Sequence, residues 1–217
     1  MRLRRKPNLA PRMERRSHLL IAEPKELYGK WRDEFGYDEI YIELGCGKGR
    51  FTAETARENP DVLIVALEKL ADAMVIALER VDEMQLANVR FINYFADYLD
   101  DYFAQGEASR IYINFCDPWP SNRHIKRRLT SRGFLDIYKK VLPPGGEIHF
   151  KTDNVPLFDY SLHEFETCGF TLSEVTRDLH GTGPAGVMTD YEMKFHGMGI
   201  PICRCVARYA RVLSFEC

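Results

Sequence analysis

Short apolar runs that alternate with amphipathic segments constrain the fold of this chain more than any other feature of its sequence. Four of five such runs are rich in β-branched or aromatic residues, and none alternates strictly between apolar and polar positions, which is typical of strands buried on both faces. The runs are Ile40–Leu44, Val62–Leu67, Val89–Ile92, Ile111–Phe115 and Glu147–Lys151. Apolar residues at three- and four-residue spacing between the runs predict crossover helices over Arg50–Asn59, Ala71–Met84 and Phe134–Leu142.

This alternation predicts an α/β fold with a Rossmann-like, doubly wound and mostly parallel sheet. After Asp153 the pattern loosens, and one helix and two strands would complete a seven-stranded sheet with an antiparallel edge. They are expected near Pro156–Cys168, Phe170–Val175 and Arg204–Arg211. A length of 217 residues suits one hydrophobic core. We therefore expect a basic, flexible N-terminal arm over residues 1–22 and a single domain over residues 23–217.

The charge distribution is more informative than the net charge of −2. Residues 1–16 hold seven Lys or Arg against the single acid Glu14, and residues 123–132 hold five Lys or Arg with no acid. Two basic clusters on a near-neutral chain favour a localised footprint for phosphates. A solvated terminus and a solvated helix face would give the same pattern, so charge alone leaves both interpretations open.

The six cysteines form no CxxC pair and show no spacing to histidine that indicates a zinc site. Cys203 and Cys205 would lie on one face of a strand, so we expect free thiols in a reducing compartment and no metal. No apolar run approaches the ~20 residues that span a bilayer, and none resembles a signal peptide. A cytoplasmic protein without membrane association is the expectation.

Acidic or amide side chains follow each predicted parallel strand. Ligands of doubly wound sheets bind at the carboxyl ends of the strands, so these side chains should meet at one edge. Any one of them alone is more often a helix cap or a solvated turn residue, but together they predict a binding site. The side chains are Glu43, Glu68, Asn93, Asp97, Asp117 and Asp153.

The glycine-rich loop after the first strand narrows the ligand. Glycine there lets the backbone approach a ligand closely, but the dinucleotide fingerprint needs a further glycine where this chain has Arg50. Glu43 is poorly placed for a pyrophosphate and well placed for a cationic ligand, whereas Glu68 can accept the hydroxyls of a ribose. A cationic nucleoside without phosphate, such as S-adenosylmethionine (SAM), fits both carboxylates.

Five segments, in this order, resemble the bacterial tRNA (guanine-N7)-methyltransferases: YIELGCGKG, VALEK, NFCDPWPSNRHIKRRL, GGEIHFKTDN and TDYEMKF. The resemblance runs from about Lys30 to the C-terminus, and the DPWP element with the basic residues behind it is its most specific part. It implies the class I methyltransferase fold. It also implies transfer of a methyl group from SAM to N7 of a guanosine in tRNA, with the variable loop as the expected position.

The resemblance also implies roles for individual residues. Asp117 would be catalytic, and Phe95 and Ser121 depart from the family pattern, which often has an acid and a Lys there. Cofactor binding would fall to Glu43, Gly45, Gly47, Gly49, Glu68, Lys69, Asn93, Ala96, Asp97 and Asp117. Substrate binding would fall to Ser121, Asp153, Thr189, Asp190, Tyr191 and Glu192, and RNA contacts to Arg123, His124, Lys126, Arg127 and Arg128.

The chemistry of guanine N7 gives these residues specific tasks. N7 carries a lone pair and no proton, so we expect Asp117 to orient the reactants and stabilise developing charge rather than to act as a base. Asp153 or Glu192 could accept the N1–H and N2–H₂ donors of guanine together. Trp119 and Tyr191 could each stack on an extruded base or pack in the core. His149 is more often a packed strand residue than a catalyst.

Other functions stay open at this point. A class I methyltransferase could act on an exocyclic amino group of a base, and a SAM-binding RNA-binding protein could lack turnover. A dinucleotide oxidoreductase is disfavoured by Arg50 and Glu43. The sequence predicts no obligate protein partner, and a monomer and a homodimer are equally compatible with it.

Overall fold

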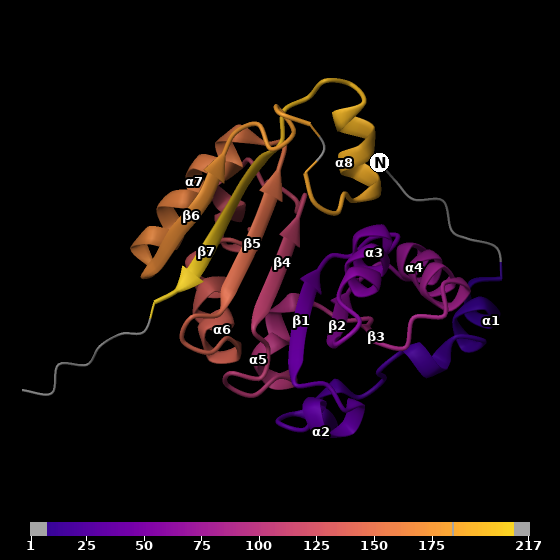
Figure 1. Cartoon of the computed structure of the whole chain (residues 1–217). Helices are drawn as coiled ribbons and strands as arrows, with labels where there is room; N and C mark the ends of the chain where they lie inside the picture. The colour runs from indigo at the N-terminus through magenta and orange to yellow at the C-terminus, as the bar shows by residue number, and fades with distance from the viewer. Residues whose placement is uncertain (1–7, 184, 211–217) are drawn as a thin grey trace, which may run out of the picture.

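The computed structural model describes residues 8–183 and 185–210, which are organised around a seven-stranded sheet (Figure 1). The strand order is β3-β2-β1-β4-β5-β7-β6. The first five strands in this order are parallel, and β7 runs antiparallel to both of its neighbours. The predicted fold class is therefore confirmed. The strands are β1 (Glu39–Leu44), β2 (Val62–Leu67), β3 (Val89–Ile92), β4 (Arg110–Asn114), β5 (Glu147–Thr152), β6 (Phe170–Thr176) and β7 (Cys203–Tyr209).

The central strands are apolar throughout because helices cover both of their faces. Every residue of β2 is buried, and β1 exposes only its first residue, Glu39. The chain order reverses at β1, which pairs with β2 on one side and with β4 on the other. Crossover connections leave the sheet in opposite directions from this point, so the carboxyl ends of β1 and β4 open a crevice between them.

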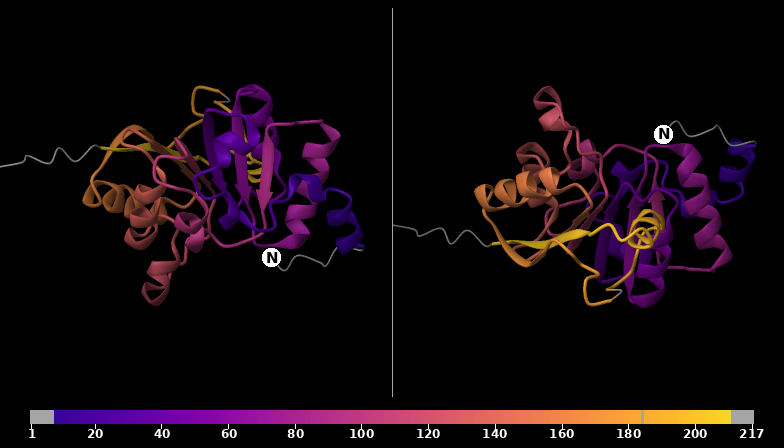
Figure 2. Two further views of the ribbon diagram at one scale, coloured as in Figure 1. Left: turned by 90° about the horizontal axis from the view of Figure 1, so that it is seen from below. Right: turned by 90° about the horizontal axis from the view of Figure 1, so that it is seen from above.

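Helices lie on both faces of the sheet (Figures 1 and 2). One apolar cluster joins β1–β3 to α3 and α4, and a larger one joins the opposite face to α5, α6 and α7. The α-helices are α1 (Leu9–Glu14), α2 (Trp31–Phe35), α3 (Arg50–Glu58), α4 (Ala71–Glu83), α5 (Leu99–Tyr102), α6 (Arg132–Val141), α7 (Val155–Thr167) and α8 (Asp190–His196). Short 3₁₀ turns are η1 (Ser17–Leu19), η2 (Pro24–Leu27), η3 (Ala96–Tyr98) and η4 (Asn122–Arg127). None of the helices in residues 8–183 and 185–210 is long and apolar enough to cross a bilayer.

The N-terminal segment differs from the flexible arm expected over residues 1–22. From residue 8 onward it packs against α4 and β3, with Leu19 buried. Arg12 donates to both carboxylate oxygens of Glu79, at 2.7 and 2.6 Å, and Arg16 forms an ion pair with Asp82 at 3.2 Å. These basic side chains are paired with acids of α4, which local charge counting cannot detect. Residues 1–7 lie outside the described residues.

Helix α8 is an element that periodicity alone did not indicate. Thr189 accepts a hydrogen bond from the Glu192 backbone N–H at 2.9 Å, and the Glu192 carboxylate accepts one from the Thr189 N–H at 3.2 Å. This reciprocal capping box starts the helix, and its Thr-x-x-Glu spacing is visible in the sequence. The helix is therefore short but has a well-defined first turn.

Candidate active site

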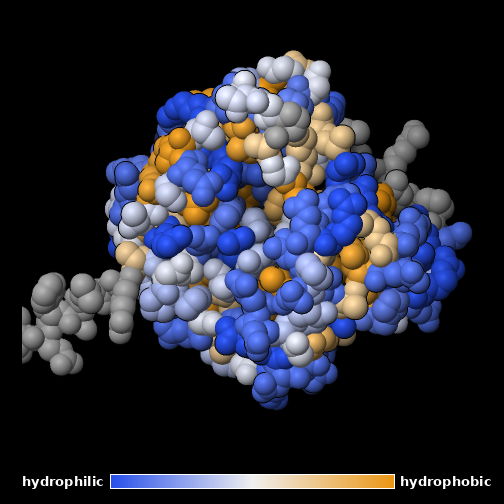
Figure 3. Space-filling model, in the orientation of Figure 1, coloured by the Kyte–Doolittle hydropathy of each residue, from blue (hydrophilic) through white to orange (hydrophobic). Residues whose placement is uncertain are grey.

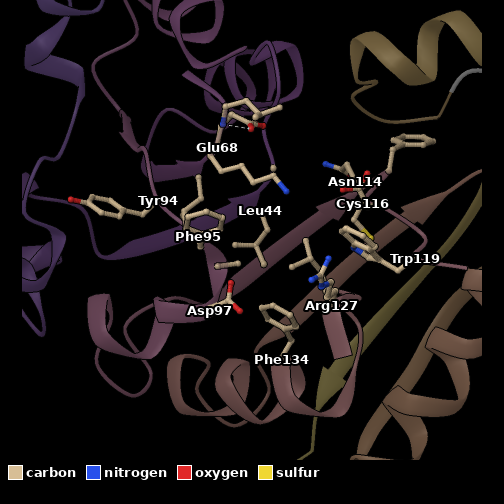
Figure 4. Close-up of a pocket in the computed structure, with 18 of the residues that line it drawn as sticks. Leu44, Glu68, Tyr94, Phe95, Asp97, Asn114, Cys116, Trp119, Arg127 and Phe134 are labelled. Atoms are coloured by element: carbon tan, nitrogen blue, oxygen red, sulfur yellow. Dashed lines mark hydrogen bonds between the residues drawn. The ribbon is translucent and has the colours of Figure 1, made fainter. Parts of the chain in front are cut away.

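A cavity of ≈ 550 Å³ opens at the carboxyl ends of β1, β2 and β4, at the switch point of the sheet (Figure 4). Residues of four loops line it together with Phe134 of α6. They are Leu44, Gly45, Leu67, Glu68, Lys69, Leu70, Tyr94, Phe95, Ala96, Asp97, Asn114, Phe115, Cys116, Asp117, Trp119, Lys126, Arg127 and Leu129. Six of the residues predicted to bind the cofactor are among them, namely Gly45, Glu68, Lys69, Ala96, Asp97 and Asp117.

Glu68 connects two loops beneath this cavity. Its carboxylate accepts hydrogen bonds from the backbone N–H groups of Gly47, at 3.0 Å, and Leu70, at 2.8 Å. The Asn93 side chain donates to the Glu68 carbonyl oxygen at 2.6 Å. Gly47 and Asn93 thus position Glu68, and neither belongs to the cavity lining. A carboxylate has about four acceptor positions, so Glu68 can still accept hydroxyl donors from a ligand.

Glu43 lies behind the cavity wall and is buried. Thr52 donates to its carboxylate at 2.5 Å and the Asn114 amide donates at 3.4 Å. Burial raises the pKa of Glu43 to about 7, because desolvation disfavours the charged form. Asn114 lines the cavity and bonds to Glu43, which is not itself among the lining residues, so the direct contact expected between Glu43 and a ligand stays a prediction.

The Asn114 side-chain oxygen is the atom of the cavity wall that most directly indicates a ligand. It is buried and has no hydrogen-bond partner within the described part of the chain. Asn114 is also the last residue of β4 and lines the cavity. Buried acceptors without a partner are rare in native proteins, so the wall fits a ligand that carries an N–H donor. The strand-end rule used on the sequence could have identified Asn114, which directly precedes the loop of Asp117.

The two outer glycines of the loop have different tasks. Gly45 lines the cavity with φ at +79°, a conformation that favours glycine. Gly49 does not line the cavity, and a Cβ atom there would lie 2.5 Å from the Ala77 Cβ. Gly49 therefore serves the close packing of α3 against α4.

The loop after β4 carries Asp117 in a strained backbone. Phe115 and Trp119, on either side of Asp117, have φ values of +53° and +41°, which are uncommon for residues other than glycine. Asp117 itself is exposed at the cavity. Residues held in such conformations cluster at functional sites, where the surrounding structure must stabilise them.

The basic residues after this loop form η4, which projects from the body of the molecule (Figure 2). Arg123, Lys126 and Arg127 are exposed, and the last two line the cavity. Ser121 is exposed at the start of the turn. Arg128 is different, because it turns inward and donates to the carbonyl oxygens of Pro118 and Trp119.

Trp119 is partly exposed and lies outside both apolar clusters. The Arg127 guanidinium lies 5.0 Å from the centre of its ring, and the His124 ring packs edge-on against it at 5.5 Å. The structure thus places Trp119 at the cavity rather than in the core (Figure 4). Of the two alternatives for Trp119, packing in the core is therefore excluded.

Helix α8 lies near the carboxyl end of β5. Most of its side chains that were predicted to bind substrate contact the rest of the protein instead. The Glu192 side chain is 0% exposed, and each of its oxygens lies 3.2 Å from the Lys151 Nζ. His180 Nε2 lies 3.0 Å from Glu192 Oε1. On the outer side, Asp190 forms an ion pair with Arg80 at 3.0 Å. Glu192 is therefore buried and fully occupied in this arrangement, whereas Asp190 is exposed, and the substrate contacts expected of both stay predictions.

Tyr191 and Asp153 are the members of the predicted substrate set that remain free for contacts on this side. The Tyr191 hydroxyl donates to the Asp153 carboxylate at 3.3 Å, and the Tyr191 ring stacks on Phe195 at 4.1 Å. Tyr191 also lies 5.0 Å from the Phe115 ring, at the start of the Asp117 loop. Thr189 caps the helix. Tyr191 thus connects α8 to the loop that carries Asp117.

A second cavity of ≈ 340 Å³ lies on the α3 side of β4 and β5, and includes Arg110, Lys151 and Arg204. The molecular face seen in Figure 3 is largely hydrophilic. Each of the three cations has a carboxylate partner, from Glu147, Glu192 or Glu174. His149 also lies there, with its pKa lowered to about 4 by burial, which agrees with a packed strand residue. Among residues 8–183 and 185–210, no group of three acids, histidines or cysteines could hold a metal ion.

The strand order with an antiparallel β7, and a cavity above an acidic residue at the end of β2, define a class I methyltransferase. Solved structures agree on the fold. A 16S rRNA methyltransferase, KamB, superposes with a TM-score of 0.63 at 16% identity, covering 82% of this chain and 92% of its own. A precorrin-6y C5,15-methyltransferase from Geobacter metallireducens GS-15 gives a TM-score of 0.54 at 16% identity, with 78% of each chain covered.

Sequence comparison identifies the family. The profile of a family described as "Putative methyltransferase" matches residues 38–205. A protein of Geobacillus sp. (strain WCH70) named tRNA (guanine-N(7)-)-methyltransferase is 46% identical over 211 residues, which cover 96% of each chain. This chain belongs to the tRNA (guanine-N7)-methyltransferase family, and the resemblance seen in its sequence motifs is confirmed.

Proposed function

We propose that this protein transfers the methyl group of SAM to N7 of a guanosine in the variable loop of tRNA. The observation that carries the proposal is the 46% identity to a tRNA (guanine-N7)-methyltransferase across 96% of both chains. The cavity at the switch point supports it, because six residues assigned to the cofactor from the sequence line this one cavity. The roles of individual residues follow from their positions in it.

The cavity fits SAM, which supplies an electrophilic methyl group bonded to a sulfonium. Glu68 would accept the ribose hydroxyls with the lone pairs that its two backbone donors leave free. The Asn114 oxygen, buried without a partner in the described chain, would accept from the amino group. Phe95 and Leu70 would cover the adenine, beside Ala96 and Asp97 of η3. Because Phe95 is apolar, it would contact the ring face and accept no hydrogen bond, so polar recognition of the adenine would fall to Asp97 and the backbone.

Asp117 would orient and stabilise rather than remove a proton. Guanine N7 has a lone pair and no proton, so the reaction needs no base at this position. Positive charge develops on the purine as the bond to N7 forms, and a carboxylate fixed at the cavity favours that charge distribution. The strained and immobilised loop keeps Asp117 in place before the substrate arrives, which lowers the entropic cost of alignment.

Asp153 is the carboxylate that we assign to guanine recognition. The N1–H and N2–H₂ donors lie side by side on the Watson–Crick edge, and a carboxylate can accept both. Glu192 already accepts from Lys151, His180 and the Thr189 backbone. Asp153 accepts only from Tyr191 among the described hydrogen bonds. Tyr191 and Trp119 would offer aromatic faces to the extruded base.

The exposed cations of η4 would bind phosphates next to the target nucleotide. Arg123, Lys126 and Arg127 are exposed, and the last two line the cavity. Phosphate contacts of such cations give salt-dependent affinity without base specificity. They would position the tRNA over Asp117.

Methyl transfer from labelled SAM to an unmodified tRNA transcript, with nucleoside analysis of the product, tests the proposal. We expect 7-methylguanosine, and chemical cleavage at this nucleoside should map it to the variable loop. A transcript whose variable-loop guanosine is replaced by adenosine is the matched control and should accept no label. Label on an exocyclic amine, or SAM binding without transfer to any tRNA, would contradict the proposal.

A further inference from the structure

Arg128 is set apart from the other cations of its basic segment by the direction of its side chain. Its Nε donates to the Pro118 carbonyl oxygen at 3.0 Å and its Nη2 donates to the Trp119 carbonyl oxygen at 3.1 Å. These two carbonyls directly follow Asp117. The neighbouring Arg127 instead faces the cavity, with its guanidinium over the Trp119 ring.

The backbone around Arg128 explains why it turns inward. Arg128 directly follows the last residue of η4, and its extended conformation, with φ −66° and ψ 129°, leads the chain back to the body of the protein. Thr130, two residues later, is fully buried and bonded to Ser161 of α7 at 2.7 Å. The guanidinium carbon of Arg128 lies over the ring of Tyr160, which belongs to the same helix, at 4.3 Å from the ring centre. A guanidinium on an aromatic ring keeps a defined plane.

Within residues 8–183 and 185–210, a backbone hydrogen bond anchors the start of the loop that Arg128 holds, where the Phe115 N–H donates to the Lys151 carbonyl oxygen at 2.9 Å, but none is donated by residues 116–121. Pro118 and Pro120 lack an N–H group, and Phe115 and Trp119 have positive φ. Such a segment persists only where surrounding groups over-determine it. The planar fork of an arginine holds its N–H donors in fixed directions toward two successive carbonyl oxygens, whereas the three donors of a lysine ammonium rotate on a flexible stem.

We propose that Arg128 is a positioning residue, which holds the loop of Asp117 in its working conformation, and that it is not a phosphate contact of the basic segment. It acts through the backbone of Pro118 and Trp119 and does not touch the reacting atoms. The kinetic part of this inference rests on the proposed function, but the conformational part does not.

Arg128→Lys separates the two roles because it keeps the positive charge and loses the fork. We expect the turnover number for tRNA methylation to fall about 10-fold or more through misalignment of Asp117. The KM for tRNA and the salt dependence of tRNA binding should stay unchanged. Arg123→Gln is the matched comparison, and it should raise KM and weaken the salt dependence with turnover preserved.

A spectroscopic measurement makes the test independent of activity. The chain has two tryptophans, Trp31 and Trp119, so protein labelled with 5-fluorotryptophan should give two fluorine resonances. Trp31 is buried in the core, with its indole N–H bonded to the Tyr102 carbonyl at 2.8 Å, and reports global folding. Arg128→Lys should shift or broaden the Trp119 resonance only, and Tyr160→Leu should give a smaller change of the same kind.

The possible results distinguish a positioning role of Arg128 from a phosphate contact and from a role in global stability. If Arg128→Lys matches Arg123→Gln, with a higher KM, a weaker salt dependence and two unchanged resonances, Arg128 is a phosphate contact and the inference is wrong. If both resonances move, Arg128 stabilises the whole fold, which also contradicts it. If the wild type methylates no tRNA, the proposed function fails, yet a selective change at Trp119 would still establish that Arg128 holds the loop.

Discussion

The two sides of the active-site cavity are built in opposite ways. On the β4 side, the Asp117 loop and η4 have a backbone held by Arg128 and side chains that project into the cavity or into solvent. On the β5 side, α8 is held by its side chains, since Glu192 is buried against Lys151 and His180. The loop side therefore keeps its functional groups free, whereas the α8 side uses most of them for attachment and leaves Tyr191 for contacts.

A sequence motif therefore does not assign one role to all of its residues. Arg127 and Arg128 are adjacent and chemically identical, and one faces the cavity while the other holds the backbone. Tyr191 and Glu192 are also adjacent, and one is exposed while the other is fully buried. Changes on the α8 side should consequently act first on stability, and changes on the loop side first on turnover or tRNA binding.

The largest effect should come from Lys151→Met. It leaves the Glu192 carboxylate buried without its cation, and breaking a buried pair in this way costs about 3–5 kcal/mol. Urea unfolding followed by circular dichroism measures the change. The control is Lys151→Met combined with Glu192→Gln, which removes the charge while an amide can still cap α8, and it should regain most of the loss. Unchanged stability with lost activity would place Lys151 among the substrate contacts and break the comparison.

Asp117→Asn should give the complementary result. We expect turnover to fall about 100- to 1,000-fold, the range seen when one electrostatic contact to a transition state is removed. The unfolding midpoint should change little, because Asp117 is exposed and its loop is held through the backbone. Asp136→Asn, at an exposed position of α6, is the control and should leave turnover unchanged. Full activity of Asp117→Asn would exclude the electrostatic role.

Glu43→Gln sharpens the comparison, because Glu43 is a buried carboxylate without a bonded cation. Its pKa is raised from 4.5 to about 7, so the folded state keeps a proton that the unfolded state releases in this interval. The protonated Glu43 therefore contributes to the free energy of unfolding below pH 4.5. This contribution is lost as the pH rises to about 7, a loss on the order of 3 kcal/mol. Glutamine cannot ionise, and a flipped Asn114 can accept from its amide.

Urea unfolding of both proteins at about pH 4.5 and about pH 8 checks this prediction. The two should have similar stability at the lower pH, and the Gln variant should be more stable at the higher pH. An advantage of the wild type at the higher pH would mean that the Glu43 carboxylate is stabilised in its charged form by its surroundings.

The smallest effect should come from Arg123→Gln. Loss of one phosphate contact should reduce the slope of log affinity against log salt by about 0.7 to 0.9 and weaken tRNA binding several-fold. Filter binding or fluorescence anisotropy across a salt series measures it. Lys25→Gln, at an exposed position on η2, should leave the slope unchanged. An equal effect of both variants would indicate diffuse attraction rather than a defined phosphate contact.

Much of the fold was accessible from sequence because it depends on local patterns. The β2 range Val62–Leu67 was predicted without error. The fourth strand was predicted one residue late, over 111–115, because Phe115 is apolar but leaves the strand with a positive φ. The N-terminal arm was expected to be flexible because the acids that pair with Arg12 and Arg16 lie about 70 residues away in the chain, on α4.

Burial periodicity, strand-end residues and motif order are linear properties of the chain, and they were enough to predict the doubly wound sheet, the edge at which ligands bind and the family. Which of the clustered residues face the cavity could not be predicted in this way, because it depends on contacts that form when the chain folds. Glu43 bonds to Asn114, Gly49 packs on Ala77, and Arg128 binds its own backbone. The physical reason is that a side chain's partners come from segments distant in the chain, and a buried polar group takes the nearest available partner, which only the packed fold brings within reach.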